Sequence, residues 1–132
     1  MSRQPIEIWI NPSCSKCRTA KAELDAAGVE YVERRYLDEP PTAAELDGVL
    51  ARLGLEPWDL ARPAETRELG IDLPKDAAHR GDWIAAMVAN PRTIQRPIIT
   101  AADGTTVVAR DAQTLAAVVD REVSTGSTTA QR

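Results

Sequence analysis

The chain has no phenylalanine, a single histidine and only two cysteines in 132 residues. Aromatic residues make up 4 % of it and apolar residues 43 %, so a hydrophobic core must rest mainly on isoleucine, leucine, valine and alanine. No stretch approaches the ~20 consecutive apolar residues of a membrane-spanning helix, which predicts a protein that does not enter a membrane. The length fits one domain, which we expect to cover residues 1–121.

An excess of positive charge is also missing. The formal net charge is −4, which argues against a protein that coats nucleic acid, and we expect no direct nucleic-acid contact. The N-terminal MSRQPIEIWI has no basic region followed by an apolar run and a small-residue cleavage site. We therefore expect a cytoplasmic protein. Thiols stay reduced in that compartment, so a close cysteine pair is more often catalytic or metal-binding than structural.

The start of the chain predicts a β-α-β unit. Ile6–Ile10 (IEIWI) is short, apolar and β-branched, which is typical of a buried strand. From Ser15 the apolar residues recur every three or four positions, and Gly28 ends this predicted helix. A second strand is expected at residues 29–37, parallel to the first because a helix forms the crossover between them.

The middle of the chain predicts a helical segment. Thr42 and Glu45 have the spacing of a capping box at the start of a helix that Gly54 ends. A short helix is expected near residues 64–69. Asp82 is expected to cap the helix after it.

Two strands and a helix follow. Residues 96–100 and 105–109 are apolar and β-branched, and the Asp-Gly pair at 103–104 is a strong hairpin signal between them. Asp111 is suited to cap a last helix. The tail at residues 122–132 is rich in Ser, Thr and Gly and has nothing to bury, so we expect it to be disordered.

The order of elements is thus β-α-β, a helical insertion and β-β-α. A parallel strand pair and a hairpin in one mixed four-stranded sheet, flanked by helices, form the thioredoxin-like α/β arrangement. A strand followed by a C-x-x-C sequence and a helix near the front of the chain is the sequence signal for that fold.

Both cysteines lie in NPSCSKCRTA, three positions apart. Cys14 falls where the helix begins, and the unpaired backbone N–H groups and the macrodipole there favour a negative charge, which lowers the pKa of a thiol. Cys17 lies one turn further on the same helix face, at a separation that suits a disulfide. Cys14 is therefore the predicted nucleophile, and Cys17 the predicted resolving thiol.

Other uses of the pair fit the sequence less well. A zinc site needs about four ligands, and the chain offers no third cysteine and one histidine, His79, more than sixty positions away, so we expect no metal. A permanent structural disulfide would close a very small ring in a reducing compartment. His79 lies in a polar loop and is expected to be a solvated side chain.

Arginines are expected near such a cysteine, because the guanidinium fork matches an oxyanion held at a helix N-terminus. Arg96 precedes Pro97, a candidate for a cis-proline beside the C-x-x-C loop. Arg110 ends the next strand, and Arg62 lies in a loop. From the residues alone, each is as consistent with a solvated charge as with substrate binding, and spacing does not select these three from the other arginines.

Three blocks of the sequence, NPSCSKCRTAKAEL, YLDEPPTAAELDGVL and NPRTIQRPIIT, resemble the thioredoxin-fold arsenate reductases in order and spacing over about residues 6–120. The resemblance implies that Cys14 attacks arsenate and that three arginines hold the oxyanion. These match Arg62, Arg96 in QRPII and Arg110 in VVAR. It also implies that arsenite is released and that an external thiol, rather than a metal or an organic cofactor, supplies the electrons.

Two departures from that family bear on the chemistry. Many members have a histidine before the Asn-Pro pair, where this chain has Ile10, so Cys14 must rely on the helix terminus and on neighbouring cations. Those members also have a serine in place of Cys17, and they use glutathione and glutaredoxin. With Cys17 present, a Cys14–Cys17 disulfide is expected in turnover, which a thioredoxin-type, glutaredoxin-type or low-molecular-weight thiol would reduce.

The cysteine pair and the R-P-I-I block also resemble the Spx-type transcription regulators. Those proteins share the fold, use the pair as a redox switch and bind RNA polymerase. The cysteines do not separate the two interpretations, whereas the three arginines favour an oxyanion enzyme. A thiol oxidoreductase that acts on another substrate is the third alternative.

Overall fold

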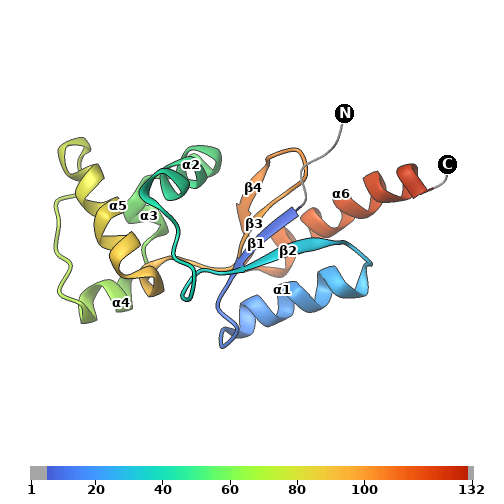
Figure 1. The fold of residues 1–132 in the computed structure, drawn as a ribbon, viewed down its shortest axis with the longest axis horizontal. Coiled ribbons are helices and arrows are strands. Elements are labelled where there is room, and N and C mark those ends of the chain that lie inside the picture. The colour runs from blue at the N-terminus through green and yellow to red at the C-terminus, as the bar shows by residue number, and fades with distance from the viewer. Residues whose placement is uncertain (1–5, 131–132) are drawn as a thin grey trace. The chain divides into compact units, whose positions relative to one another are not determined.

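The computed structural model describes the backbone of residues 6–130 and the side chains of residues 6–122 (Figure 1). In chain order the elements are β1 Ile6–Ile10, α1 Ser15–Ala26, β2 Tyr31–Arg35, α2 Ala43–Leu53, α3 Pro57–Leu60, α4 Pro63–Glu68, η1 Ala77–His79, α5 Arg80–Ala89, η2 Pro91–Thr93, β3 Ile98–Thr100, β4 Thr106–Val108 and α6 Ala112–Ala130. The described residues divide into a sheet unit, residues 6–35 and 96–130, and a helical unit, Tyr36–Gln95. The single domain expected over residues 1–121 remains a prediction.

The sheet unit contains a mixed four-stranded sheet in the order β2-β1-β3-β4. β1 and β2 are parallel, with Ile8 opposite Glu33, and β3 is antiparallel to both β1 and β4. This order confirms the predicted α/β thioredoxin-like fold. The hairpin turn between β3 and β4 includes Gly104 at φ +93°, a conformation that residues with a side chain rarely adopt.

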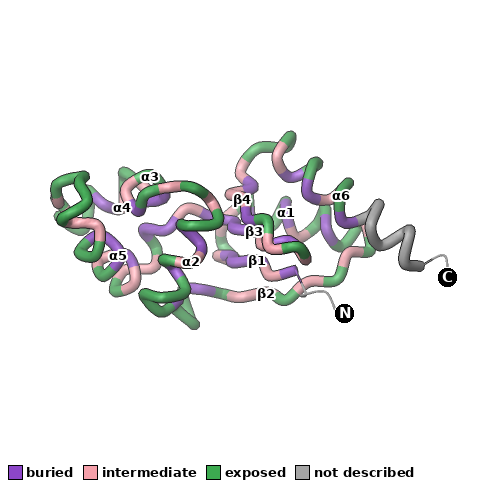
Figure 2. The backbone as a smooth tube through the Cα atoms, turned by 90° about the horizontal axis from the view of Figure 1, so that it is seen from above, coloured by how far each residue is buried: buried purple, intermediate pink, exposed green. Residues whose placement is uncertain are grey.

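Helices α1 and α6 contact each other and cover one face of the sheet. Alternate residues of β1 point to this face, because successive side chains of a strand point to opposite sides. In Figure 2 most of β1 is coloured as buried. The core cluster of this unit consists of Ile6, Ile8, Ile10, Cys17, Ala20, Leu24, Ile99, Ala109, Leu115 and Val118. The Cys17 side chain is thus part of the hydrophobic core.

In the helical unit, α2 begins and ends as predicted. The Thr42 hydroxyl accepts the Glu45 N–H at 3.1 Å, and the Glu45 carboxylate accepts the Thr42 N–H at 2.9 Å. Gly54 ends the helix in the left-handed conformation, at φ +70°. α2 contacts α5, and the buried residues of these two helices are Leu46, Val49, Leu50, Trp83, Ile84 and Met87.

The segment between α3 and α4 is tied to the end of the helical unit by backbone hydrogen bonds. The Arg62 N–H donates to the Thr93 carbonyl at 2.6 Å, and the Gln95 N–H donates to the Leu60 carbonyl at 3.0 Å. These bonds fix the main chain of the loop that carries Arg62.

Several boundaries differ from the predicted ones. β3 begins at Ile98 rather than at residue 96, and β4 covers Thr106–Val108 rather than residues 105–109. β2 is shorter than the expected strand at residues 29–37. The prediction that Asp82 caps a helix is wrong, because α5 begins at Arg80 and Asp82 lies inside its first turn. Asp76 caps the preceding 3-10 turn instead, its carboxylate accepting the His79 N–H at 3.0 Å, and that turn continues directly into α5.

α6 begins at the predicted cap, where the Asp111 carboxylate accepts the Thr114 N–H at 2.7 Å. Its backbone is helical to Ala130, so the helix is longer than the sequence predicted. The side chains after Glu122 lie outside the described residues, and the disorder expected from residue 122 onward remains a prediction. Among the described helices, none is both long and apolar enough to cross a membrane.

Candidate functional site

Asn11 organises the loop between β1 and α1. Its carbonyl accepts the Cys14 N–H at 2.9 Å, and its side-chain Oδ1 accepts the Ser13 N–H at 2.9 Å, a turn typical of asparagine. Its own N–H donates to the Cys17 Sγ at 3.4 Å. One residue therefore sets the loop and touches both cysteine positions. The sequence reasoning did not assign Asn11, although an Asn-Pro pair directly before a reactive helix start was the available signal.

Cys14 is the N-cap residue of α1, with an extended backbone at φ −86° and ψ 126°, and its side chain is half-buried. Burial is the largest influence on its pKa and raises it. Hydrogen bonds from the Cys17 N–H and thiol, the Lys16 N–H and the Arg96 guanidinium together outweigh burial and lower the pKa of Cys14 to about 7. This direction agrees with the prediction for a thiol at a helix N-terminus.

Cys17 has the opposite character. It is 1 % exposed, and this burial is the main reason why the pKa of its thiol is raised to about 12. The hydrogen bond from the Asn11 N–H lowers the pKa in part, and the negative charge of the Cys14 thiolate raises it further. Both cysteines are free thiols in the structure. At neutral pH about half of the Cys14 thiol is therefore ionised, whereas Cys17 stays protonated. A covalent adduct on Cys14 removes its negative charge, and with it one of the effects that raise the pKa of Cys17.

The rate of Cys14 alkylation should therefore follow one ionisation at a midpoint near pH 7. Below the midpoint the rate should rise about tenfold per pH unit, because only the thiolate reacts. Cys17 should add no second phase below about pH 10. Iodoacetamide labelling followed by trypsin separates the two cysteines, since Lys16 lies between them. A Cys14 midpoint near the ordinary value of about 8.5 would contradict the assignment.

Arg96 supplies the positive charge that touches Cys14. It is 7 % exposed, its guanidinium hydrogen-bonds to the Cys14 sulfur, and its peptide bond to Pro97 is cis, as predicted. Arg110 donates from Nη1 to the Arg96 carbonyl at 2.6 Å, and the Ala109 N–H donates to the Pro97 carbonyl at 2.9 Å. The structure thus brings together Cys14, Arg96 and Arg110, with Arg110 holding the main chain of Arg96.

Arg62 belongs to the helical unit. It is the N-cap residue of α4, its side chain is 23 % exposed, and its Nε lies 3.0 Å from a Glu65 carboxylate oxygen. That ion pair ties the guanidinium to the start of its own helix. Its participation in a site with Cys14 remains a prediction.

The histidine lies in the helical unit and pairs locally. His79 Nδ1 is 2.6 Å from Asp76 Oδ1, and both side chains are exposed. Across the part of the chain that the structure describes, no three His, Cys, Asp or Glu side chains gather as a potential metal site.

A reactive cysteine at a helix N-terminus, with a second cysteine one turn later on a thioredoxin-like sheet, defines a C-x-x-C thiol protein of that fold class. The model of the ArsC family matches residues 9–118. The chain therefore belongs to the ArsC family.

Relatives cover most of this chain. An uncharacterized protein in the glnII region of Streptomyces viridochromogenes is 56 % identical over 108 residues, which are 80 % of this chain and 91 % of that protein. An arsenate reductase from Neisseria meningitidis is 34 % identical over 117 residues, 86 % of this chain and 97 % of its own. The solved arsenate reductase from Vibrio cholerae matches with a TM-score of 0.70 at 28 % identity, covering 89 % of this chain and 99 % of its own.

The relatives also include a transcription regulator of the Spx type. The global transcriptional regulator Spx 1 of Lactococcus lactis is 30 % identical over 97 residues, 72 % of this chain and 74 % of its own. Relatives of this chain therefore carry different names, arsenate reductase and transcriptional regulator.

Proposed function

We propose that the protein is a cytoplasmic arsenate reductase with Cys14 as its nucleophile. The observation that carries the proposal is a half-buried thiolate at the start of α1 in contact with the guanidinium of a buried arginine, Arg96. Arsenate resembles phosphate in charge and shape, and a helix N-terminus with an arginine fork suits such an oxyanion. Membership of the ArsC family supports this substrate class.

The first step is nucleophilic. The Cys14 thiolate attacks arsenic, a bond between sulfur and arsenic forms, and one arsenate oxygen takes up protons and leaves as water. Arsenic stays in its pentavalent state at this stage. Arg96 balances the charge of the oxyanion beside the sulfur, and Arg62 and Arg110 are proposed to add positive charge.

The second step transfers the electrons. A second thiol, Cys17 or an external one, gives up its proton and attacks the Cys14 sulfur. The sulfur–sulfur bond forms as the sulfur–arsenic bond breaks, two electrons pass to arsenic, and arsenite leaves. Thiol–disulfide exchange with an external reductant then restores both cysteines.

An assay of arsenate-dependent NADPH oxidation tests the proposal. Thioredoxin with its reductase, and then glutaredoxin with glutathione and its reductase, would be supplied as the electron source. We expect oxidation that requires both the protein and arsenate, and faster turnover with the thioredoxin system, because Cys17 allows an internal disulfide. No arsenate-dependent oxidation with either system would contradict the proposal.

Arg96→Ala should raise the KM for arsenate about ten- to hundredfold, since a hydrogen bond to a charged group contributes roughly 1.5–3 kcal/mol. It should also raise the pH midpoint of Cys14 alkylation, because the guanidinium lowers the pKa of that thiol. Arg110→Ala should move both quantities in the same directions by less, because Arg110 holds the Arg96 carbonyl. Arg121→Ala, at an exposed pair with Asp103, is the control. An unchanged KM in Arg96→Ala would contradict its role.

A redox-sensing regulator is the second candidate. The similarity to Spx 1 and the C-x-x-C pair favour it, and a switch would need the same difference between the two thiols. Pull-down of RNA polymerase by the oxidised and reduced protein tests it. Polymerase binding that depends on the redox state, without arsenate reduction, would favour the regulator.

A further inference from the structure

A cavity of about 210 Å³ lies within the helical unit, and the proposed mechanism does not use it. Its walls come from α3, α4 and α5 and from the segment at residues 71–75. We call it the tryptophan pocket, because Trp58 and Trp83 both line it. Pro63, Ile71 and Leu73 add apolar side chains that are at least partly exposed. The volume is below the ~300 Å³ at which drug-sized sites begin, so it suits a ligand of about one ring.

The two tryptophans of this pocket differ in access. Trp83 is 3 % exposed, and its Nε1 donates to the Pro74 carbonyl at 3.0 Å. Trp58 is half-buried and meets Trp83 edge to face, with the ring centroids 6.3 Å apart and the ring planes at 63°. The Trp58 indole N–H has no hydrogen-bond partner among the described residues. The buried Trp83 therefore supports Trp58, and Trp58 offers the aromatic surface that a ligand can reach.

Three charged side chains line the tryptophan pocket, and their charges are open. Arg67, Asp72 and Lys75 are exposed, and within the part of the chain that the structure describes their side chains form no ion pair or hydrogen bond. Two cations against one carboxylate leave one positive charge. A ligand with a single carboxylate therefore balances the charge of the pocket.

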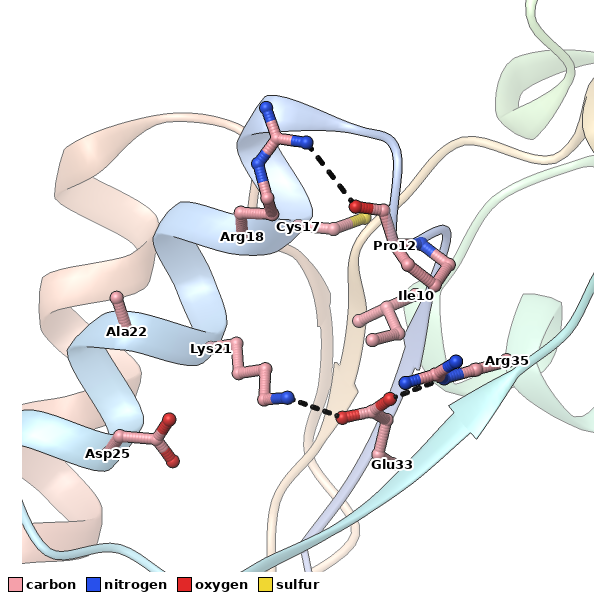
Figure 3. Close-up of a pocket in the computed structure, with 9 residues that line it drawn as sticks. All are labelled: Ile10, Pro12, Cys17, Arg18, Lys21, Ala22, Asp25, Glu33 and Arg35. Carbon is pink, nitrogen blue, oxygen red and sulfur yellow. Dashed lines mark hydrogen bonds and ion pairs between the residues drawn. The ribbon is translucent and has the colours of Figure 1, made fainter.

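A groove of about 310 Å³ in the sheet unit, walled by α1, β2 and the end of β1, differs in this respect (Figure 3). Lys21 and Arg35 both bind the Glu33 carboxylate there, at 3.1 Å and 2.8 Å, and reach it from either side. The Asp25 carboxylate accepts the Tyr31 hydroxyl at 2.7 Å. Most charges of this groove thus have partners already, whereas those of the tryptophan pocket are available to a ligand.

We propose that the tryptophan pocket binds a small aromatic carboxylate, with its ring against Trp58 and its carboxylate held by Arg67 and Lys75. Edge-to-face and offset packing of aromatic rings adds to the free energy gained by burying their surface, which favours a planar ring over an aliphatic chain of similar size. The guanidinium fork of Arg67 matches the geometry of a carboxylate. The inference concerns the helical unit alone and does not depend on the chemistry of Cys14, so it and the proposed function can fail separately.

An NMR titration of the full chain with sodium benzoate, at constant pH and ionic strength, tests the inference. The nitrogen–proton correlation spectrum gives one indole signal for each of the three tryptophans, which Trp58→Phe and Trp83→Phe assign. We expect the Trp58 signal to shift and to saturate, with a dissociation constant in the millimolar range of a one-ring ligand. The signal of Trp9, which lies on β1 in the sheet unit, should not move.

Two further probes separate the ring from the charge. Benzyl alcohol has the ring without the carboxylate, and acetate has the carboxylate without the ring. Each should bind at least about tenfold more weakly than benzoate, because each loses one of the two contacts that the pocket provides.

The double variant Arg67→Ala/Lys75→Ala should weaken benzoate binding about tenfold, since each exposed charge pair changes an affinity severalfold. Both side chains are exposed, so the backbone amide signals should show an unchanged fold. Arg92→Ala is the matched control, because Arg92 is an exposed arginine of the same unit that pairs with Glu68 and does not line the pocket.

Three results would overturn the inference. Shifts of the Trp58 signal that stay linear in benzoate, or no shift at all, would show that no site exists. Equal weakening by the double variant and by Arg92→Ala would indicate general attraction of anions. Equal affinity for benzoate and for either acetate or benzyl alcohol would show that the ring or the charge is not recognised.

Discussion

Cys14→Ser is expected to abolish arsenate-dependent NADPH oxidation, lowering kcat by at least about a thousandfold, because the variant has no nucleophile that ionises near neutral pH. The thiol of Cys14 has a pKa of about 7 and is therefore substantially ionised in the cell, whereas a serine hydroxyl is not. The substitution exchanges one half-buried atom and keeps the backbone contact of the N–H to Asn11. The fold and the thermal midpoint should change little.

Ser13→Ala is the matched control for this variant. Ser13 is exposed, it precedes the nucleophile directly, and the contact it makes to Asn11 uses its backbone N–H, which alanine retains. Its turnover should stay close to that of the natural sequence. Turnover in Cys14→Ser above a few hundredths of that level would show that another group attacks arsenate.

Cys17→Ser should have the second largest effect, and it should depend on the reductant. Thioredoxin-coupled turnover should fall at least about a hundredfold, because no internal disulfide can form for thioredoxin to reduce. Turnover with glutathione and glutaredoxin should persist, since an external thiol can attack Cys14 directly. Stoichiometric alkylation of Cys14 should also persist, because the nucleophile and the start of its helix are unchanged.

A second variant keeps this test independent of stability. Cys17 lies in the core cluster, where a serine hydroxyl without a partner costs about 1–3 kcal/mol. Cys17→Ala avoids the polar group and should show the same dependence on reductant, with its fold checked by circular dichroism. Thioredoxin-coupled turnover unchanged in both variants would eliminate the internal disulfide from the mechanism.

Much of the fold was predictable because its signals are local. The apolar run Ile6–Ile10, the capping box at Thr42 and the Asp-Gly turn each depend on residues a few positions apart, and all appear as predicted. The predicted start of α5 was wrong because local signals can compete. Asp82 has the chemistry of a cap, but Asp76 caps a 3-10 turn that leads directly into the helix, and the sequence pattern does not rank two competing caps.

Some features of the site were also predictable from local sequence, and others were not. The low pKa of Cys14 follows from its place at a helix start, which the sequence reveals. The sequence does not reveal which arginines lie near Cys14, because several arginines fit the spacing equally well. Only the assembled sheet selects among them. Residues 96 and 14 lie far apart in the chain, and β3 must pair with β1 before the Arg96 guanidinium reaches the Cys14 sulfur.

The sequence by itself determined the thioredoxin-like order of elements, the reactive cysteine and its less ionisable partner. Only the tertiary structure decided that Arg110 acts on the main chain of Arg96 and that Asn11 contacts Cys17. The physical reason is range. Hydrogen-bonded turns, caps and helix dipoles act within about one turn of the chain, whereas a guanidinium contact or a groove forms between strands and helices that packing alone brings together.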